Sequence, residues 1–263
     1  MEKSRNTSWI ILLFIFTSGL NAQASVDYLV DVVKRLNIPH AEFKGTPLRE
    51  VLDFLQDKSA ELDVREVDPT KKGFNIVLYT GKSDDKIDDI PITLKLDNVS
   101  FDVAFKRIAA FAKMKHVIES HAVFFAPLNW NLPNRNKDAN IPDVMKNITV
   151  PSLNFSNTSF IDALKYLERQ SVALDLTEQE PVKKGIKVII QPPYSGWKGD
   201  EVKITMRMRN VPLLNALDYT AALAGMQCEV EIRTVLITPI TDDKMDYLNS
   251  AEQPTPLPKS KPK

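Results

Sequence analysis

The clearest pattern in the chain is a strict alternation of apolar and polar residues that occurs twice. Ile92, Leu94 and Leu96 alternate with polar neighbours, and residues 204–209 show the same alternation. A period of two predicts a strand that buries one face. Shorter apolar runs predict further strands in matching pairs, at 39–43 and 151–155, 74–79 and 186–190, 115–119 and 227–232, and 122–126 and 234–238.

Apolar residues at helical spacing predict two helices between these strands in each half of the chain. Leu48, Val51 and Leu55 repeat at this spacing after Thr46, a residue type suited to cap a helix. The remaining predicted helices begin after Ser100, Thr158 and Pro212. Each half therefore has the predicted element order β-α-β-β-α-β-β.

The two halves are copies of one another. Without a gap, residues 31–128 align with residues 143–240 at an offset of 112 positions. The aligned blocks share many identical residues, for example Pro69-x-Lys71-Lys72-Gly73 and Pro181-x-Lys183-Lys184-Gly185. We therefore predict an α+β fold class, with two tandem copies of a β-α-β-β-α-β-β module whose two helices pack on a small mixed sheet.

The repeat also sets the predicted domain boundaries. Residues 25–128 form the first module and residues 143–240 the second, joined by the Asn-rich linker 129–142. The Pro- and Lys-rich tail 241–263 has too few apolar residues for a core, so we expect it to be disordered. Because each copy has its own helices and apolar strand faces, we expect each module to fold as a separate fragment.

The first 24 residues have the order of regions found in a secretory signal peptide. Lys3 and Arg5 precede the apolar stretch 9–16, and the small-residue motif Ala22-Gln23-Ala24 follows. This apolar core is shorter than the roughly 20 residues that span a bilayer, which makes an uncleaved anchor the weaker alternative. We predict a periplasmic or secreted protein, cleaved near Ala24, with no transmembrane segment in the mature chain.

Composition narrows the function classes. The chain has 34 basic and 34 acidic side chains and a pI near 6.8, so it lacks the positive charge typical of nucleic-acid-binding proteins. None of its 8 glycines stands in a G-x-G motif, which argues against Rossmann and P-loop sites. The single cysteine, Cys228, cannot form an intramolecular disulfide.

The sequence shows no constellation of residues that predicts catalysis or metal binding. Its three histidines lack metal-ligand spacing, and the acidic stretch 84–89 lacks the ligand spacing of a calcium loop. No serine stands in a G-x-S-x-G motif. We therefore predict that the protein is not an enzyme and has no cofactor and no metal site.

Three segments of the second copy carry a family resemblance. They are Val150-Pro151-Ser152-Leu153-Asn154-Phe155, Phe160-Ile161-Asp162-Ala163-Leu164, and the run from Ile204 through Asn210-Val211-Pro212-Leu213 to Leu217. Together they resemble the STN-type domain, the short N-terminal domain of secretins and TonB-dependent receptors. The first copy is similar but has Ser100-Phe101 where the family usually has Pro-Leu. The resemblance implies a periplasmic module that docks neighbouring subunits or regulators.

These observations predict a non-catalytic envelope protein whose paired STN-like modules dock an envelope protein partner, in association with a secretin-type or TonB-linked system. The expected contacts are strand addition at a sheet edge and packing on a helix face. We expect Arg207, Arg209 and Trp197 to face the partner. The alternative is a binding or enzymatic module for a glycan or peptide, with Trp130, Tyr194 and Trp197 as stacking residues. The sequence leaves the partner's identity and the oligomeric state open.

Overall fold

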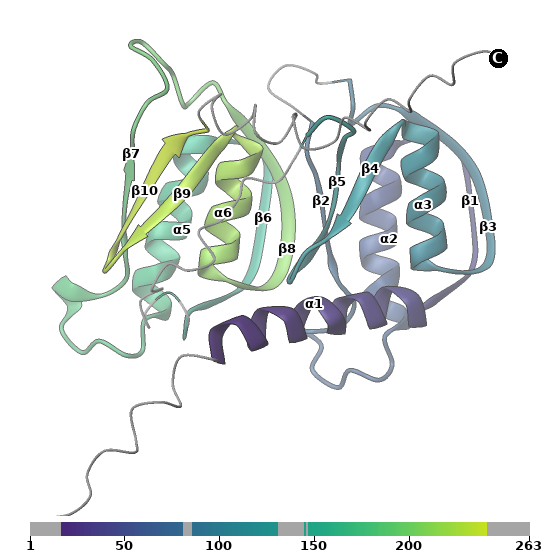
Figure 1. Cartoon of the computed structure of the whole chain (residues 1–263), viewed down its shortest axis with the longest axis horizontal. Coiled ribbons are helices and arrows are strands. Elements are labelled where there is room, and N and C mark those ends of the chain that lie inside the picture. The colour runs from purple at the N-terminus through teal and green to yellow at the C-terminus, as the bar shows by residue number, and fades with distance from the viewer. Residues whose placement is uncertain (1–16, 81–85, 131–144, 146, 241–263) are drawn as a thin grey trace, which may run out of the picture.

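The computed structural model in Figure 1 describes residues 17–80, 86–130, 145 and 147–240, with only the backbone of residues 17–25. Helices and several small sheets make up these residues, which confirms the predicted α+β class. The apolar part of the predicted leader, most of the predicted linker and the predicted disordered tail lie outside the described residues. No helix in the described ranges has both the length and the apolar character needed to cross a bilayer.

An additional helix precedes the predicted elements of the first half. The elements of this half are α1 (Thr17–Arg35), β1 (Asn37–Pro47), α2 (Leu48–Leu62), β2 (Asn75–Leu78), β3 (Pro91–Ser100), α3 (Phe101–Ala112), β4 (Met114–Ile118) and β5 (Ala122–Pro127). Those of the second half are β6 (Thr149–Ser159), α5 (Phe160–Leu174), the 3₁₀ turn η1 (Pro181–Lys183), β7 (Lys187–Ile190), β8 (Lys203–Pro212), α6 (Leu213–Leu223), β9 (Met226–Glu231) and β10 (Thr234–Pro239). Most bounds recur at the spacing of 112 residues.

The strands of each half form two sheets, whereas we had predicted one small mixed sheet. In the first half β1 pairs antiparallel with β3, and a second sheet has the order β2-β5-β4. The second half has the corresponding sheets β6-β8 and β7-β10-β9. Figure 1 shows α2 and α3 between the two sheets of the first half, and α5 and α6 between the two sheets of the second half. The two-stranded sheet has one solvent face, since β1 buries roughly alternate residues, whereas β2 is buried along its whole length and its counterpart β7 is not.

A buried aspartate follows α2 in the first copy and α5 in the second copy, and it holds the next loop in place. Asp175 accepts hydrogen bonds from the Gly185 amide at 3.0 Å and from the Arg233 guanidinium at 3.0 Å. Asp63 has the same position in the first copy, but its cationic partner is Arg35 of α1 at 3.2 Å. A buried carboxylate needs a cation beside it. In the first copy α1 supplies this cation, whereas in the second copy the turn between β9 and β10 supplies it.

The repeated Lys-Lys-Gly turns have a structural explanation in this loop. Gly73 has φ +69° and Gly185 has φ +73°, in the left-handed region that favours glycine. A Cβ atom at Gly73 would lie 2.3 Å from Ser59 Oγ, and one at Gly185 would lie 2.5 Å from Ser171 Oγ. The turn therefore requires glycine both for its backbone conformation and for close packing against the preceding helix.

The buried residues form two hydrophobic cores, and one core contains residues from both halves. The first core lies within the first half and includes Leu29, Val32 and Leu36 from α1 or its end. The second core contains the buried residues of the second half together with Val77, Ala122 and Phe124 of the first half. The described parts of the two copies therefore share a packed surface.

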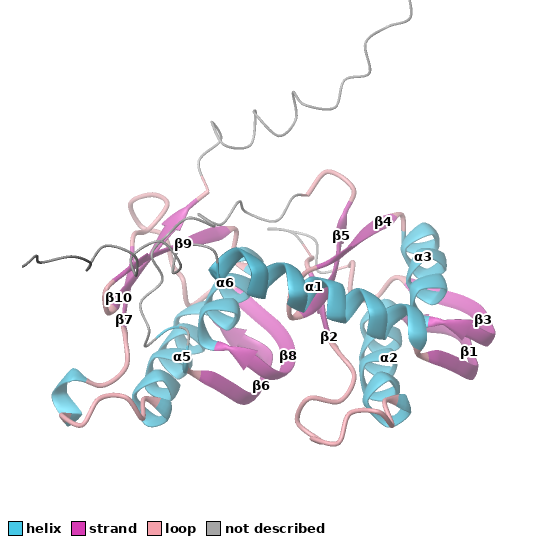
Figure 2. Ribbon diagram, turned by 60° about the horizontal axis from the view of Figure 1, so that its bottom comes forward, coloured by secondary structure: helices cyan, strands magenta, loops and turns pink. Residues whose placement is uncertain are grey.

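Helix α1 extends along one side of the molecule past elements of both copies, as Figure 2 shows. The predicted cleavage motif at residues 22–24 lies inside this helix. Leu29, Val32 and Leu36 lie beyond the motif and are buried. Cleavage near Ala24 would thus shorten α1 and leave its buried residues in the mature chain.

Candidate functional site at the junction of the two copies

The junction forms where β8 of the second copy lies beside β2 of the first (Figure 1). Each of these strands ends its own sheet, so each presents unpaired backbone groups to the other. Gln56 of α2 connects the two edges. Its side-chain nitrogen donates to the Arg207 carbonyl at 3.1 Å, while its side-chain oxygen accepts from the Ile76 amide at 2.8 Å.

Asn75 makes a second connection at the start of β2. Its side-chain nitrogen donates to the Arg209 carbonyl at 3.0 Å and to the His121 carbonyl at 3.1 Å. Its side-chain oxygen accepts from the Arg209 amide at 2.8 Å. A carboxamide contains both donor and acceptor, so it can satisfy an N–H and a C=O of one strand edge together. Gln56 and Asn75 are only 1% and 7% exposed, which makes these bonds the polar centre of the junction.

Opposite charges flank this polar centre. The Arg207 guanidinium is 3.0 Å from an Asp57 carboxylate oxygen and 3.9 Å from one of Asp53, and it donates to the Asp53 carbonyl at 3.2 Å. Burial raises the pKa of Asp53, although the Arg207 charge opposes this. Burial also lowers the pKa of Arg209, whose guanidinium donates to the Gln56 carbonyl at 3.5 Å. Two cations of β8 thus face two carboxylates of α2.

Aromatic side chains complete the contact on the outer face of the first copy's three-stranded sheet. Phe124 of β5 meets Tyr219 of α6 edge to face, with ring centroids 4.8 Å apart. Trp130 stacks on Tyr79 at 4.6 Å and on Phe124 at 6.1 Å. Such pairs contribute beyond the area that they bury. The start of the predicted linker is therefore packed against the junction.

The structure places the three predicted partner-facing residues in two different locations. Arg207 and Arg209 face the other copy of the same chain, and both are half-buried. Trp197 is half-buried elsewhere, against Phe160 at the start of α5, with ring centroids 6.1 Å apart. The alternation of β8 predicted that these arginines lie on the face away from the core, but it carried no information on what covers that face.

Sequence reasoning missed Gln56 and Asn75, the two residues that join the strand edges. A signal for them exists in the comparison of the copies. The 112-residue offset aligns Gln56 with Glu168 and Asn75 with Lys187. At both positions the first copy has a neutral amide and the second copy has a charged side chain. Because burial disfavours an unpaired charge, this difference indicates that the positions are buried in the first copy and more exposed in the second.

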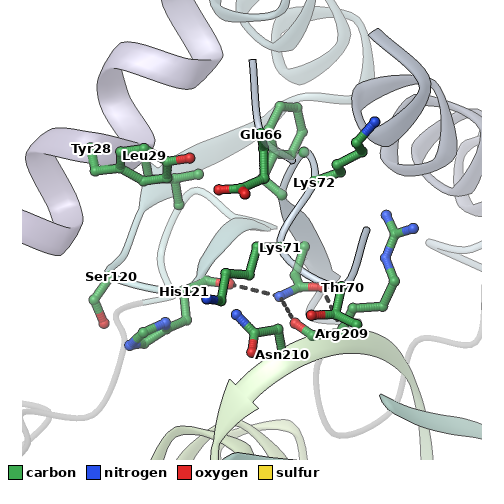
Figure 3. Close-up of a pocket in the computed structure, with 13 residues that line it drawn as sticks. Tyr28, Leu29, Glu66, Thr70, Lys71, Lys72, Ser120, His121, Arg209 and Asn210 are labelled. Carbon is green, nitrogen blue, oxygen red and sulfur yellow. Dashed lines mark hydrogen bonds between the residues drawn. The ribbon is translucent and has the colours of Figure 1, made fainter. Parts of the chain in front are cut away.

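A cavity of about 300 Å³ opens beside the junction, between α1, the loop before β2, the β4–β5 turn and β8. Figure 3 shows Lys71, His121 and Asn210 around it, with Tyr28 and Leu29 of α1 on the opposite side. Its lining residues are Tyr28, Leu29, Glu66, Thr70, Lys71, Lys72, Gly73, Phe74, Asn75, Ser120, His121, Arg209 and Asn210.

Basic, acidic, neutral polar and apolar side chains all line this cavity. Lys71 is 3.4 Å from Asp68, so its charge is already partly balanced. His121 aligns with Arg233, which neutralises the buried Asp175 in the second copy. Because Arg35 performs that role in the first copy, the shorter His121 leaves space here. The described residues contain no group of three or more metal-ligating side chains of the kinds His, Cys, Asp and Glu.

Comparisons with known proteins add no family to this description. No protein-family model matches the chain, and no curated protein matches it.

Replacing Asn75 by alanine is expected to lower the free energy of unfolding by about 2 kcal/mol. The change leaves the Arg209 amide and carbonyl and the His121 carbonyl without this partner in a buried place, and an unsatisfied buried group costs about 1–3 kcal/mol. Urea unfolding of the full chain measures the effect. The matched control is Lys187→Ala at the aligned, exposed position, which should change stability by less than about 0.5 kcal/mol. Equal effects of the two substitutions would contradict the assigned role of Asn75.

Proposed function

We propose that this chain is an exported, non-catalytic envelope protein that docks other proteins through its paired STN-like modules. The observation that carries the proposal is the junction itself. There one module binds an open strand edge of the next module through buried carboxamides, opposite charges and aromatic contacts. Edge recognition of this kind is a recurring mode of protein–protein binding. The resemblance to the STN-type domain supports the same function.

Both ends of the molecule have the strands needed for such contacts. Strand β3 ends the two-stranded sheet of the first copy, and β7 ends the three-stranded sheet of the second. Figure 1 shows β7 and β3 at opposite ends of the molecule. Protein partners, including those of a secretin-type or TonB-linked system, would bind there by strand addition.

The proposed export rests on the order of regions in the leader. Lys3 and Arg5, the apolar stretch 9–16 and the motif Ala22-Gln23-Ala24 direct the chain to the periplasm or the medium. N-terminal sequencing of the protein recovered from the envelope fraction tests this. We expect the sequence to begin at Ser25, and a chain that retains Met1 in the cytoplasm would contradict export.

The docking function is tested by site-specific photo-crosslinking in the cell that produces the protein. A photoreactive residue is placed at Ile189 of β7, at Lys95 of β3, and, as control, at Val182, which is 97% exposed on the η1 turn. We expect covalent protein adducts from position 189 or 95 and none from position 182. If all three positions give no adduct, or the same adducts, the docking proposal is wrong.

The alternative of a glycan- or peptide-binding module has narrower support. Trp130 is stacked in the junction and Trp197 is half-buried, so of these three aromatic residues only Tyr194, 65% exposed, presents a free face. The observation in its favour is the cavity beside Lys71 and His121. Titration with envelope glycans and peptides, followed by tryptophan fluorescence with Trp197→Ala as control, separates the two functions. Saturable change in fluorescence would favour the alternative.

A further inference from the structure

The repeat supplies a template for a second docking surface. In the first copy, one face contacts β8 and α6, and this first-copy face consists of Asp53, Gln56, Asp57, Asn75, Val77 and Phe124. The offset of 112 residues aligns it with a second-copy face that consists of Lys165, Glu168, Arg169, Lys187, Ile189 and Leu236. Val77 is 1% exposed under the neighbouring copy, whereas Ile189 is 44% exposed. The described part of the chain leaves the second-copy face uncovered.

The second-copy face retains the backbone geometry of the docking surface. Strand β7 pairs with β10 in the register in which β2 pairs with β5, and no strand of the described residues pairs with its outer side. Glu168 accepts a hydrogen bond from the Val188 amide at 3.3 Å, just as Gln56 accepts one from the Ile76 amide. The helix and the edge strand are therefore held together in the same way in both copies.

The charge of the face is reversed between the copies. Lys165 and Arg169 are aligned with Asp53 and Asp57, and Lys187 is aligned with the neutral Asn75. All three basic side chains belong to exposed residues, and none forms an ion pair with another described residue. A strand that docks here as β8 docks on the first copy would therefore need carboxylates where β8 has Arg207 and Arg209.

We propose that the second-copy face binds an open edge strand of a partner protein that carries two acidic side chains at positions i and i+2. This inference rests on the proposed docking function and specifies its partner. The strand would lie beside β7, with its carboxylates toward Lys165 and Arg169, and its backbone groups within reach of Glu168 and Lys187.

A second copy of this chain does not fit the face. The strand that would dock is β3, on which Lys95 is aligned with Arg207. Lys95 would meet Lys165 and Arg169, and like charges across an interface are unfavourable. Arg107 of α3 is aligned with the buried Tyr219, so the aromatic contact would be lost as well. The occupant is therefore a different protein.

The acidic-strand requirement can be tested with the full chain as its own probe. Lys95→Glu gives β3 carboxylates at positions 95 and 97, and Arg107→Tyr restores the aromatic residue. We expect this double variant to associate head to tail in sedimentation experiments, at least about tenfold more tightly than the wild-type chain, and less so at high salt. Adding Lys165→Glu and Arg169→Glu to the same chain should abolish the association.

The matched control adds Lys34→Glu and Arg65→Glu to the double variant, which changes the net charge equally at exposed sites of the first copy. It should associate as the double variant does, and circular dichroism should show native melting for all variants. The proposed face is wrong if the natively folded double variant does not associate. It is also wrong if association survives the charge reversal at Lys165 and Arg169. Crosslinked adducts at position 95 in the wild-type chain would then still support the proposed docking function. Failure of the proposed face is therefore distinguishable from failure of the docking function.

Discussion

Replacing Phe124 by alanine is expected to destabilise the chain by about 3–5 kcal/mol, the range for a phenylalanine in a well-packed core. Phe124 is 1% exposed and belongs to the core of the second copy although it lies on β5 of the first. The substitution removes the contacts with Tyr219 and Trp130 and leaves a cavity in the junction. Urea unfolding of the full chain, followed by tryptophan fluorescence and by circular dichroism, measures the loss.

The repeat offers a matched control for this substitution. Leu236 has the aligned position in β10 and is half-buried, because no further copy covers it among the described residues. We expect Leu236→Ala to cost about 1 kcal/mol, since only part of its side chain is removed from water. If Phe124→Ala costs no more than Leu236→Ala, the core does not extend across the junction.

The same unfolding data address the prediction that each module folds as a separate fragment. Separation of the copies would expose Val77, Ala122 and Phe124, which are at most 1% exposed in the full chain. Burial of apolar area stabilises proteins by about 25 cal/mol per Å², so the copies should unfold in one cooperative transition. Separate transitions for the two copies would instead support independent folding.

Replacing Asp175 by asparagine is expected to cost about 2–3 kcal/mol at pH 7, because an amide oxygen is a weaker acceptor than the buried carboxylate for the Gly185 amide and for the partly exposed Arg233 guanidinium, whose other carboxylate neighbour, Glu178, is 3.7 Å away. Burial alone would raise the pKa of the Asp175 carboxyl group. Hydrogen bonds from the Thr177 hydroxyl, the Gly185 amide and Arg233 outweigh that effect and hold the pKa well below its usual range. The carboxylate form is therefore the one that stabilises the fold.

The sign of the pH dependence follows from this lowered pKa. Asp175 contributes its full stability above the pKa of the unfolded chain, about 3.9, and loses it as the pH falls toward the folded-state value. The difference between wild type and Asp175→Asn should therefore be smaller at pH 3 than at pH 7, by about 1 kcal/mol. Urea unfolding at both pH values measures it, with Asp200→Asn at an exposed site as control. A difference that grows on acidification would contradict the assignment.

Much of each copy could be predicted from the sequence because its signals are local. The alternation of Ile92, Leu94 and Leu96 predicts a strand, and β3 spans these residues with Ile92 and Leu96 fully buried. Glycine in the Lys-Lys-Gly turns is likewise a local requirement of backbone conformation. Such signals do not specify which strands pair, so the division into two sheets could not be predicted.

The site was less predictable because it depends on contacts between copies. The outward position of Arg207 follows from the period of β8, but the facing residues lie on α2, far away in the sequence. The useful signal was the difference between aligned positions, as in Asn75 and Lys187. Where two copies of one module differ in charge at positions of equal geometry, they have different neighbours.

The way in which the copies join makes the two ends of the molecule different from one another. The β8 edge of the second copy meets the β2 edge and α2 of the first copy, so the two contacting surfaces are unlike, and repetition of such a contact generates either a ring or an open-ended chain. The edge of β3 remains at one end, and the basic face along β7 remains at the other. The two ends of the molecule therefore differ in chemistry, and a neighbour that contacts one end meets different groups from a neighbour at the other.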